Sequence, residues 1–159
     1  MNSWNVETCR HGSIEPEDGL PSWCRENVQS VANLGCFIQR ITDEMACEGF
    51  PENEIQYVRL ALEEAIVNAN KHGHHGDWTL PVRVRYRFDG RGVTAQVEDE
   101  GSGFDPENVL DPLAPENLNR PSGRGLLLMR AFMTRVCHNQ QGNCVCFCKH
   151  RSDGPLANA

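Results

Sequence analysis

The sequence lacks long apolar runs, a secretory leader and an excess of basic residues. No uncharged stretch approaches the ~18 apolar residues of a membrane span, and the opening residues MNSWNVETCRHG contain no apolar signal-peptide core. Lys and Arg number 15 against 22 Asp and Glu, which gives a formal charge of −7 and a pI near 5.3. This acidic balance disfavours direct binding to nucleic acid or to an anionic membrane. We expect a soluble, cytoplasmic protein.

The eight cysteines form no C-x-x-C pair, which disfavours a zinc knuckle or a thioredoxin-type redox site. One alternative is a disulfide between Cys137 and Cys144, because a four-residue hairpin turn would place them opposite each other. We favour the interpretation that the cysteines are reduced and pack as small apolar side chains.

The length of 159 residues fits one domain, and apolar spacing predicts two helices in its first half. The first helix is predicted from about Arg25 to a glycine cap at Gly49. The second begins near Pro51, with Asn53 or a neighbour as its cap, and runs to Gly73. The apolar positions of the first helix are Val31, Leu34, Ile38, Ile41 and Met45. Those of the second helix are Val58, Leu62, Ala65, Ile66 and Ala69.

Alternating apolar residues predict strands at 82–88 and 93–99, with Asp99 continuing the buried face of the second strand. Residues 105–124 are rich in Pro, Asn and Asp and read as a long loop. A short apolar helix, GLLLMRAFM, and a terminal hairpin of RVCH and NCVCFCKH follow.

Connections by hairpins favour an α+β fold, a two-layer α/β sandwich with a mostly antiparallel mixed sheet and helices on one face. The predicted domain covers residues 25–150. Residues 1–24 are expected to form an N-terminal strand or loop, and residues 151–159 a frayed tail.

Three polar side chains share one line along the second helix. At ~100° per residue, Glu64, Asn68 and Lys71 fall within about 60° of one another, beside the apolar stripe. Glu63 and Asn70 belong to another face, which we expect to meet solvent. An ordinary solvated helix face is the alternative interpretation of the three residues taken alone.

Two further segments, each containing two glycines, also have the residues of a binding site. Asp99 is a carboxylate on a buried face, which is costly without hydrogen-bond donors, and Gly101 and Gly103 follow it, where a backbone can turn tightly against a ligand. Ser122-Gly123-Arg124-Gly125 directly precedes an apolar helix, whose free amide groups favour phosphate. Each segment alone is a common turn or helix cap.

Together the three segments resemble the Bergerat ATP-binding fold of gyrase, heat-shock chaperones, histidine kinases and mismatch-repair ATPases. E-x-x-x-N in EEAIVNANKHG is similar to the first motif, D-x-G-x-G in DEGSGFDP to the second and G-x-G-L in GRGLLLMRAFM to the third. The patterns N-A-x-x-H-G, D-x-G-x-G-F-D-P and G-R-G-L-x-L-M-R more closely resemble the anti-sigma factor serine kinases. The resemblance covers residues 25–150.

The resemblance implies a role for each residue of the first motif. Asn68 would be the protein's ligand for Mg²⁺, which prefers hard oxygen ligands. Glu64 would take the proton from the attacking hydroxyl or orient a water. Lys71 would meet the phosphates of ATP.

The other two motifs would complete the nucleotide site. By the resemblance, Asp99 accepts the adenine amino group, and Gly101 and Gly103 are hinges for the loop. The third motif would contribute residues that close over the phosphates as a lid, namely Gly123, Arg124, Gly125 and Leu126. Family members often begin the last strand with Gly-Thr-Thr, whose hydroxyl helps on the adenine side. Here Gly142-Asn143-Cys144 offers no hydroxyl.

The activity implied is an ATP- and Mg²⁺-dependent serine/threonine protein kinase. It would sequester a sigma factor and phosphorylate a small anti-anti-sigma partner, and it could form a homodimer. One alternative is a nucleotide-dependent partner-binding regulator, or an ATPase, without kinase activity. Another is a detached histidine-kinase catalytic domain, although none of the six His is followed by Glu or Asp.

Two further patterns have ordinary structural interpretations. The His cluster HGHH, at 72–75, lies at a predicted helix exit, where His favours the negative end of the dipole, so a metal site is disfavoured. The row Arg83, Arg85 and Arg87 could face nucleic acid. A solvated sheet face is favoured instead, with Glu98 close to Arg83 across the hairpin.

Overall fold

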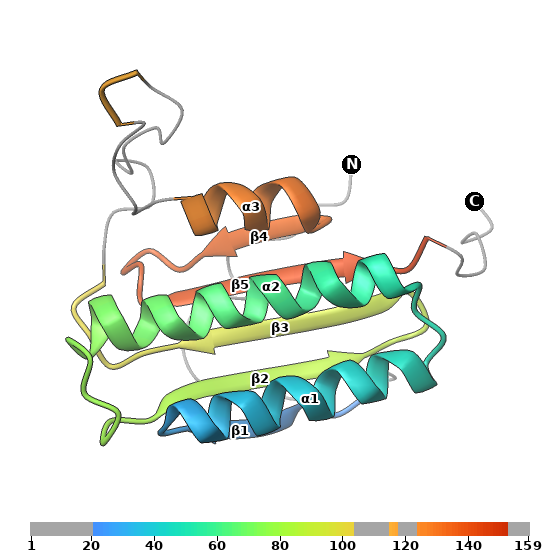
Figure 1. Ribbon diagram of the computed structural model, residues 1–159, viewed down its shortest axis with the longest axis horizontal. Coiled ribbons are helices and arrows are strands. Elements are labelled where there is room, and N and C mark those ends of the chain that lie inside the picture. Colours follow the sequence, from blue (N-terminus) through green and yellow to red (C-terminus); the bar gives the residue numbers. More distant parts are fainter. Residues whose placement is uncertain (1–20, 104–114, 118–123, 153–159) are drawn as a thin grey trace.

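The computed structural model describes residues 21–103, 115–117 and 124–152. Figure 1 shows the elements of these residues in their spatial arrangement. In chain order they are β1 (Cys24–Val28), α1 (Val31–Cys47), α2 (Glu52–Asn68), the π-helical turn η2 (Ala69–Gly73), β2 (Val82–Phe88), β3 (Gly92–Glu98), the 3-10 turn η3 (Pro115–Asn117), α3 (Arg124–Phe132), β4 (Arg135–His138) and β5 (Cys144–His150).

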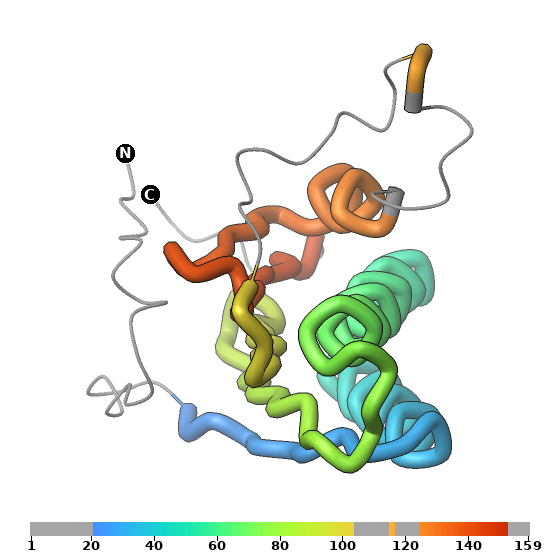
Figure 2. The backbone as a smooth tube through the Cα atoms, turned by 90° about the vertical axis from the view of Figure 1, so that its left-hand side faces the viewer, coloured from blue at the N-terminus to red at the C-terminus, as the bar shows by residue number. Residues whose placement is uncertain are grey.

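The strands form one sheet in the order β1-β2-β3-β5-β4. All four strand pairings in the described residues are antiparallel. Figure 2 shows α1 and α2 together on one side of this sheet. The α+β fold and the two-layer α/β sandwich predicted from the hairpins are therefore confirmed, with helices on one face.

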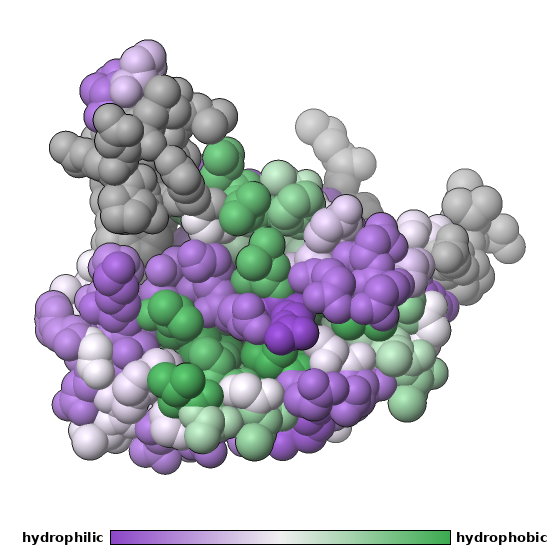
Figure 3. Space-filling model, viewed as in Figure 1, coloured by the Kyte–Doolittle hydropathy of each residue, from purple (hydrophilic) through white to green (hydrophobic). Residues whose placement is uncertain are grey.

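The core lies between this sheet and the two long helices. The predicted stripe of α2 is buried throughout, and so are the predicted positions of α1 except the first. Val31 is 69% exposed, because it is the first residue of its helix. Figure 3 shows the helical face, on which apolar and hydrophilic residues are interspersed. Single exposed apolar side chains such as Leu60 and Val67 are normal on a protein surface.

The start of the first helix differs from the prediction. Residues Cys24–Val28 form an edge strand that pairs with β2, and α1 begins only at Val31. Ser30 has an extended backbone, and its Oγ accepts the Asn33 N–H at 3.0 Å. This N-cap separates strand from helix, so the predicted helical start near Arg25 is wrong.

The second helix begins at Glu52, near Pro51 as predicted, but Asn53 is not its cap. Its N-cap is Pro51, which makes no side-chain capping bond, and Asn53 lies inside the helix. At the end of α1, Gly49 has a φ of +81° just after the C-cap residue, as the predicted glycine cap requires.

Strand β3 lies in the middle of the sheet and is buried on both faces. Val93, Ala95 and Val97 face the helices, as predicted, and Thr94 and Gln96 on the other face are also buried. The predicted contact across the β2–β3 hairpin is confirmed, since Arg83 and Glu98 are paired in register and form a 2.9 Å ion pair.

The terminal hairpin has a different register from the predicted one. Cys137 lies opposite Cys146 rather than Cys144. The turn is wider than four residues because the Asn139 side chain accepts backbone N–H groups as far along as Cys144, at 3.2 Å. A disulfide between Cys137 and Cys144 is therefore contradicted.

Most of the predicted loop 105–124 lies outside the described residues, as do 1–20 of the N-terminal segment and 153–159 of the tail. Among the described helices, none combines the length and the apolar character needed to cross a membrane.

Candidate functional site

The three sequence motifs converge at one end of the domain. Figure 1 shows the last turns of α2, the end of β3 and the start of α3 at the same end of the molecule. The first motif lies on α2, the second directly follows β3, and the third leads into α3. Segments far apart in the sequence thus form one candidate site.

Helix α3 is held against α2 and β5 by contacts at its far end. The rings of Tyr57 and Phe132 stack with their centroids 4.4 Å apart and almost parallel. Lys149 of β5 donates from Nζ to the Phe132 carbonyl at 3.0 Å, at the C-terminal end of the helix where a cation is favourable. These contacts fix the position of the third motif relative to the first.

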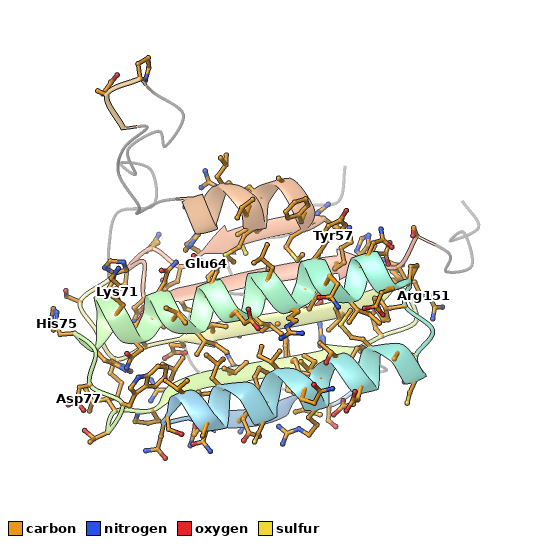
Figure 4. All side chains as sticks on the ribbon, viewed as in Figure 1. Tyr57, Glu64, Lys71, His75, Asp77 and Arg151 are labelled. Carbon is orange, nitrogen blue, oxygen red and sulfur yellow. The ribbon has the colours of Figure 1, made fainter. Side chains whose placement is uncertain are left out.

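Glu64 contacts the start of α3. A Cβ atom on Gly125 would lie 2.4 Å from Cδ of Glu64, so the carboxylate side chain packs directly on the Gly125 backbone. Figure 4 shows Glu64 on the side of α2 toward α3, and Lys71 at the end of the helix, in η2. Glu64 and Asn68 are half-buried and Lys71 is exposed, so the predicted line of three polar residues borders the core.

The end of the first motif packs against the second. A Cβ on Gly73 would lie 2.3 Å from Cγ of Asp99, and a Cβ on Gly101 would lie 2.6 Å from the Gly73 carbonyl oxygen. Only glycine fits at either position, because real Cβ atoms essentially never approach so closely. Backbone of the helix end therefore lies directly against the turn that carries Asp99.

Asp99 is a buried acid, 9% exposed, as its predicted place on the inner face requires. Burial raises the pKa of its carboxyl group above the ordinary value, and a hydrogen bond from the Gly101 N–H opposes this rise. That bond is 2.8 Å long and ends on Oδ1. The site thus holds a desolvated carboxyl group, which gains from a polar ligand group that donates to it.

The helix changes pitch where it reaches the site. Residues Ala69–Gly73 form a π-helical turn, a feature often found at functional sites. Asn70 was predicted to face solvent but is 4% exposed. The segment after the turn folds back over it, with the Gly76 N–H bound to the Asn70 carbonyl at 3.0 Å.

Two residues outside the motifs hold the Asp99 turn. His74 is 3% exposed, and its Nε2 accepts the Glu100 N–H at 2.9 Å. Asn143 accepts the Asp99 N–H at 3.0 Å with its carbonyl and donates from Nδ2 to the Asp99 carbonyl at 3.2 Å. Asn143 stands where the family resemblance led us to expect Thr, and that departure was the only sequence signal for it.

The other residues predicted for the site make fewer contacts with one another. Gly103 is exposed, with a φ of +80°, and its backbone packs on Gln141. Leu126 is half-buried in the first turn of α3, Arg124 is the first residue of that helix, and Gly123 lies outside the described residues. In the described part of the chain, Asn68 and Lys71 form no side-chain hydrogen bond with Asp99.

The His cluster does not converge on one point. His74 is buried and bound to Glu100, whereas His72 and His75 are exposed. Within residues 21–103, 115–117 and 124–152, no group of three or more His, Cys, Asp or Glu is placed to hold a metal ion.

Comparison with known families matches residues 28–149 to the histidine kinase-like ATPase domain, which is most of the chain. The chain belongs to this family. The match contains all three motifs and lies within the domain predicted at 25–150.

Three curated relatives are similar to about half of the chain. An anti-sigma F factor of Clostridium acetobutylicum is 33% identical over 87 residues, which is 52% of this chain and 59% of the relative. A serine-protein kinase RsbW of Listeria innocua is 29% identical over 94 residues, covering 55% and 60%. A serine/threonine-protein kinase BtrW of Bordetella bronchiseptica is 29% identical over 84 residues, covering 52% and 59%. The chain thus spans about three fifths of these relatives' own length.

Proposed function

We propose that this chain is an ATP- and Mg²⁺-dependent serine/threonine protein kinase of the anti-sigma factor type, acting in the cytoplasm. The observation that carries the proposal is that the three motifs lie at one end of a histidine kinase-like ATPase domain, with Glu64 packed on Gly125 and Gly73 packed on Asp99. The printed names of the relatives, an anti-sigma factor and serine kinases, support the same activity.

The purine would bind at the Asp99 turn. A carboxylate desolvated by burial accepts a hydrogen bond strongly, and the adenine amino group is such a donor. The glycine positions beside it, Gly73 and Gly101, let backbone pack closely around the Asp99 side chain, which fixes the turn that the base would approach. Gly103 would allow the following loop to move when nucleotide binds.

The phosphates and the metal would bind between α2 and the start of α3. Asn68 offers one hard amide oxygen on the half-buried edge of α2, which fits Mg²⁺ shared with phosphate oxygens and water. When bound, this ion would neutralise charge on the phosphates. Lys71, one turn further, would pair with them, and the backbone N–H groups at the start of α3 would point toward them.

Glu64 would serve as the general base. It lies one turn before Asn68 and packs against Gly125, so it would be close to a terminal phosphate bound at the start of α3. It would accept the proton of a Ser or Thr hydroxyl as that oxygen attacks the phosphorus, with ADP as the leaving group. With water as the nucleophile, the same site would give only an ATPase.

The partners would be a sigma factor, which the chain sequesters, and a small anti-anti-sigma protein, which it phosphorylates. Both are inferred from the family resemblance and from the names of relatives. A homodimer is part of the same proposal. The residues predicted to form a nucleotide-dependent lid, 105–124, lie mostly outside the described part of the chain.

The deciding experiment incubates the purified chain with γ-labelled ATP, Mg²⁺ and candidate partners, and then searches the partners for phosphoserine and phosphothreonine. Glu64→Gln should still bind ATP but transfer no phosphate. Glu63→Gln is the matched control, because Glu63 is paired with Arg59 on another face of α2 at 3.1 Å. Binding without transfer to any partner would favour a nucleotide-dependent regulator, and absence of nucleotide binding would overturn the proposal.

A further inference from the structure

Each of the three consecutive backbone N–H groups at residues 99–101 donates a hydrogen bond, and the three acceptors belong to different parts of the chain. The Asp99 N–H binds the Asn143 carbonyl, and the Gly101 N–H binds the carboxylate of Asp99 itself. The middle one, from Glu100, binds Nε2 of His74 at 2.9 Å. The peptide that links Asp99 to Glu100 is therefore anchored on its N–H side by a side chain from the end of η2.

The backbone of His74 is firmly placed at the end of η2. This residue caps η2, where the backbone N–H of His74 binds the carbonyls of Ala69 and Asn70 at 3.2 and 3.1 Å. Gly73, immediately before it, packs against the Asp99 side chain with no space to spare. Nε2 is the ring atom that accepts the N–H, whereas Nδ1 is buried with no hydrogen-bond partner among the described residues. Only an acceptor at the Nε2 position can make this bond.

We propose that His74 is a positioning residue that sets the direction of the Asp99 carboxylate and so makes the site select purines with a 6-amino group. The inference rests on the proposed nucleotide site. If the part-buried Glu100 N–H lost its acceptor on His74, it would no longer hold the peptide in its present orientation, and the peptide would rotate toward another acceptor or water. Rotation of that peptide turns the neighbouring Asp99 and separates its Oδ1 from the Gly101 N–H.

The sharpest test uses two variants that differ only in where they place an amide. In Gln, the terminal oxygen reaches the position of Nε2, so His74→Gln keeps the acceptor. In Asn, the amide reaches only the position of Nδ1, so His74→Asn loses it. His75→Asn is the control for loss of a neighbouring imidazole, since His75 is exposed and its φ of +53° suits Asn.

Affinity is measured by calorimetry with ATP and with purine riboside triphosphate, which lacks the 6-amino group, both with Mg²⁺. The wild-type chain and His74→Gln should prefer ATP by about tenfold, the effect of one hydrogen bond to a charged acceptor. His74→Asn should bind the two nucleotides within about twofold of each other. A role in folding alone would weaken both nucleotides equally and leave the preference unchanged.

The outcomes separate the inference from the proposed function. If the wild-type chain binds neither nucleotide, the nucleotide site itself is wrong. If it prefers ATP and His74→Asn keeps that preference, the positioning role is overturned while the nucleotide site stands. Amide hydrogen exchange gives a second readout, in which the Glu100 amide should exchange slowly in the wild-type chain and in His74→Gln and faster in His74→Asn.

Discussion

Glu64 occupies the space that a side chain at position 125 would need. The Cβ of an alanine at Gly125 would lie 2.4 Å from Cδ and 2.5 Å from Cγ and Oε1 of Glu64. The obstacle is the far part of a flexible side chain rather than backbone, so the chain can adapt by moving it. Glu64, the proposed general base, can therefore take its position only because residue 125 of α3 has no side chain.

Gly125→Ala should therefore reduce phosphotransfer more than stability. Displacement of the Glu64 carboxylate should lower the transfer rate by roughly 10–100-fold. The free energy of unfolding should change by no more than about 1 kcal/mol, because alanine also favours helix. Gly35→Ala is the control, since Gly35 lies inside α1 with open space around it, and that variant should keep full activity. Unchanged phosphotransfer in Gly125→Ala would contradict the role of Glu64.

Asn68→Ala should abolish binding of Mg·ATP, because it removes the only amide oxygen proposed to hold the metal. Calorimetry with and without Mg²⁺ makes the measurement, and the metal dependence should vanish together with the affinity. Asn53→Ala, in the exposed first turn of the same helix, is the matched control and should bind as the wild type does. Full affinity in Asn68→Ala would show that the metal ligand has been assigned wrongly.

Asp99→Asn should change the pH dependence of stability in a defined direction. A raised carboxyl pKa means that the folded state holds its proton more tightly than the unfolded chain does. The contribution of Asp99 to stability is complete below the ordinary value of 3.8 and is lost as pH rises through the raised pKa. The stability of Asp99→Asn relative to the wild type should therefore increase with pH and then level off. Urea unfolding at several pH values between about 3 and 7 tests this, and a constant difference would contradict it.

Asn139→Ala should destabilise the turn that supports Asp99. The Oδ1 of Asn139 accepts the N–H groups of Gly142, Asn143 and Cys144 at 2.8, 3.1 and 3.2 Å. Loss of this shared acceptor should lower the free energy of unfolding by about 2 kcal/mol, measured in denaturant. Gln140→Ala, at an exposed neighbouring position, should change it by less than about 0.5 kcal/mol.

Periodicity in the sequence was sufficient to predict the two long helices, the central hairpin and the layer order. It failed where the pattern is short or the geometry irregular. Strand β1, with the sequence CRENV, is a short edge strand that is mostly exposed and has no apolar alternation, so it was predicted as the start of a helix. Asn70 was assigned to solvent because a regular helix was assumed, whereas the chain there forms a π turn and folds back.

The candidate site divides in the same way. Residues of the three motifs could be found because each motif combines a polar group with glycine at fixed spacing. The two residues that hold the Asp99 turn, His74 and Asn143, could not be found from the sequence. His74 is one of several neighbouring histidines, and Asn143 was noticed only as a departure from Gly-Thr-Thr. Their contacts depend on which backbone N–H groups lie within reach, and that is decided only when β3, η2 and the terminal turn pack together.

Strand β3 is flanked by β2 and β5 and ends one residue before Asp99. Asp99 is thus attached to a central strand, and central strands belong to the part of a domain that unfolds last. A ligand bound to Asp99 should therefore stabilise the domain against global unfolding rather than against local opening. Melting temperature should consequently report occupancy at this acid directly. A thermal-shift screen of nucleoside triphosphates would then rank them without any knowledge of the protein's physiological targets.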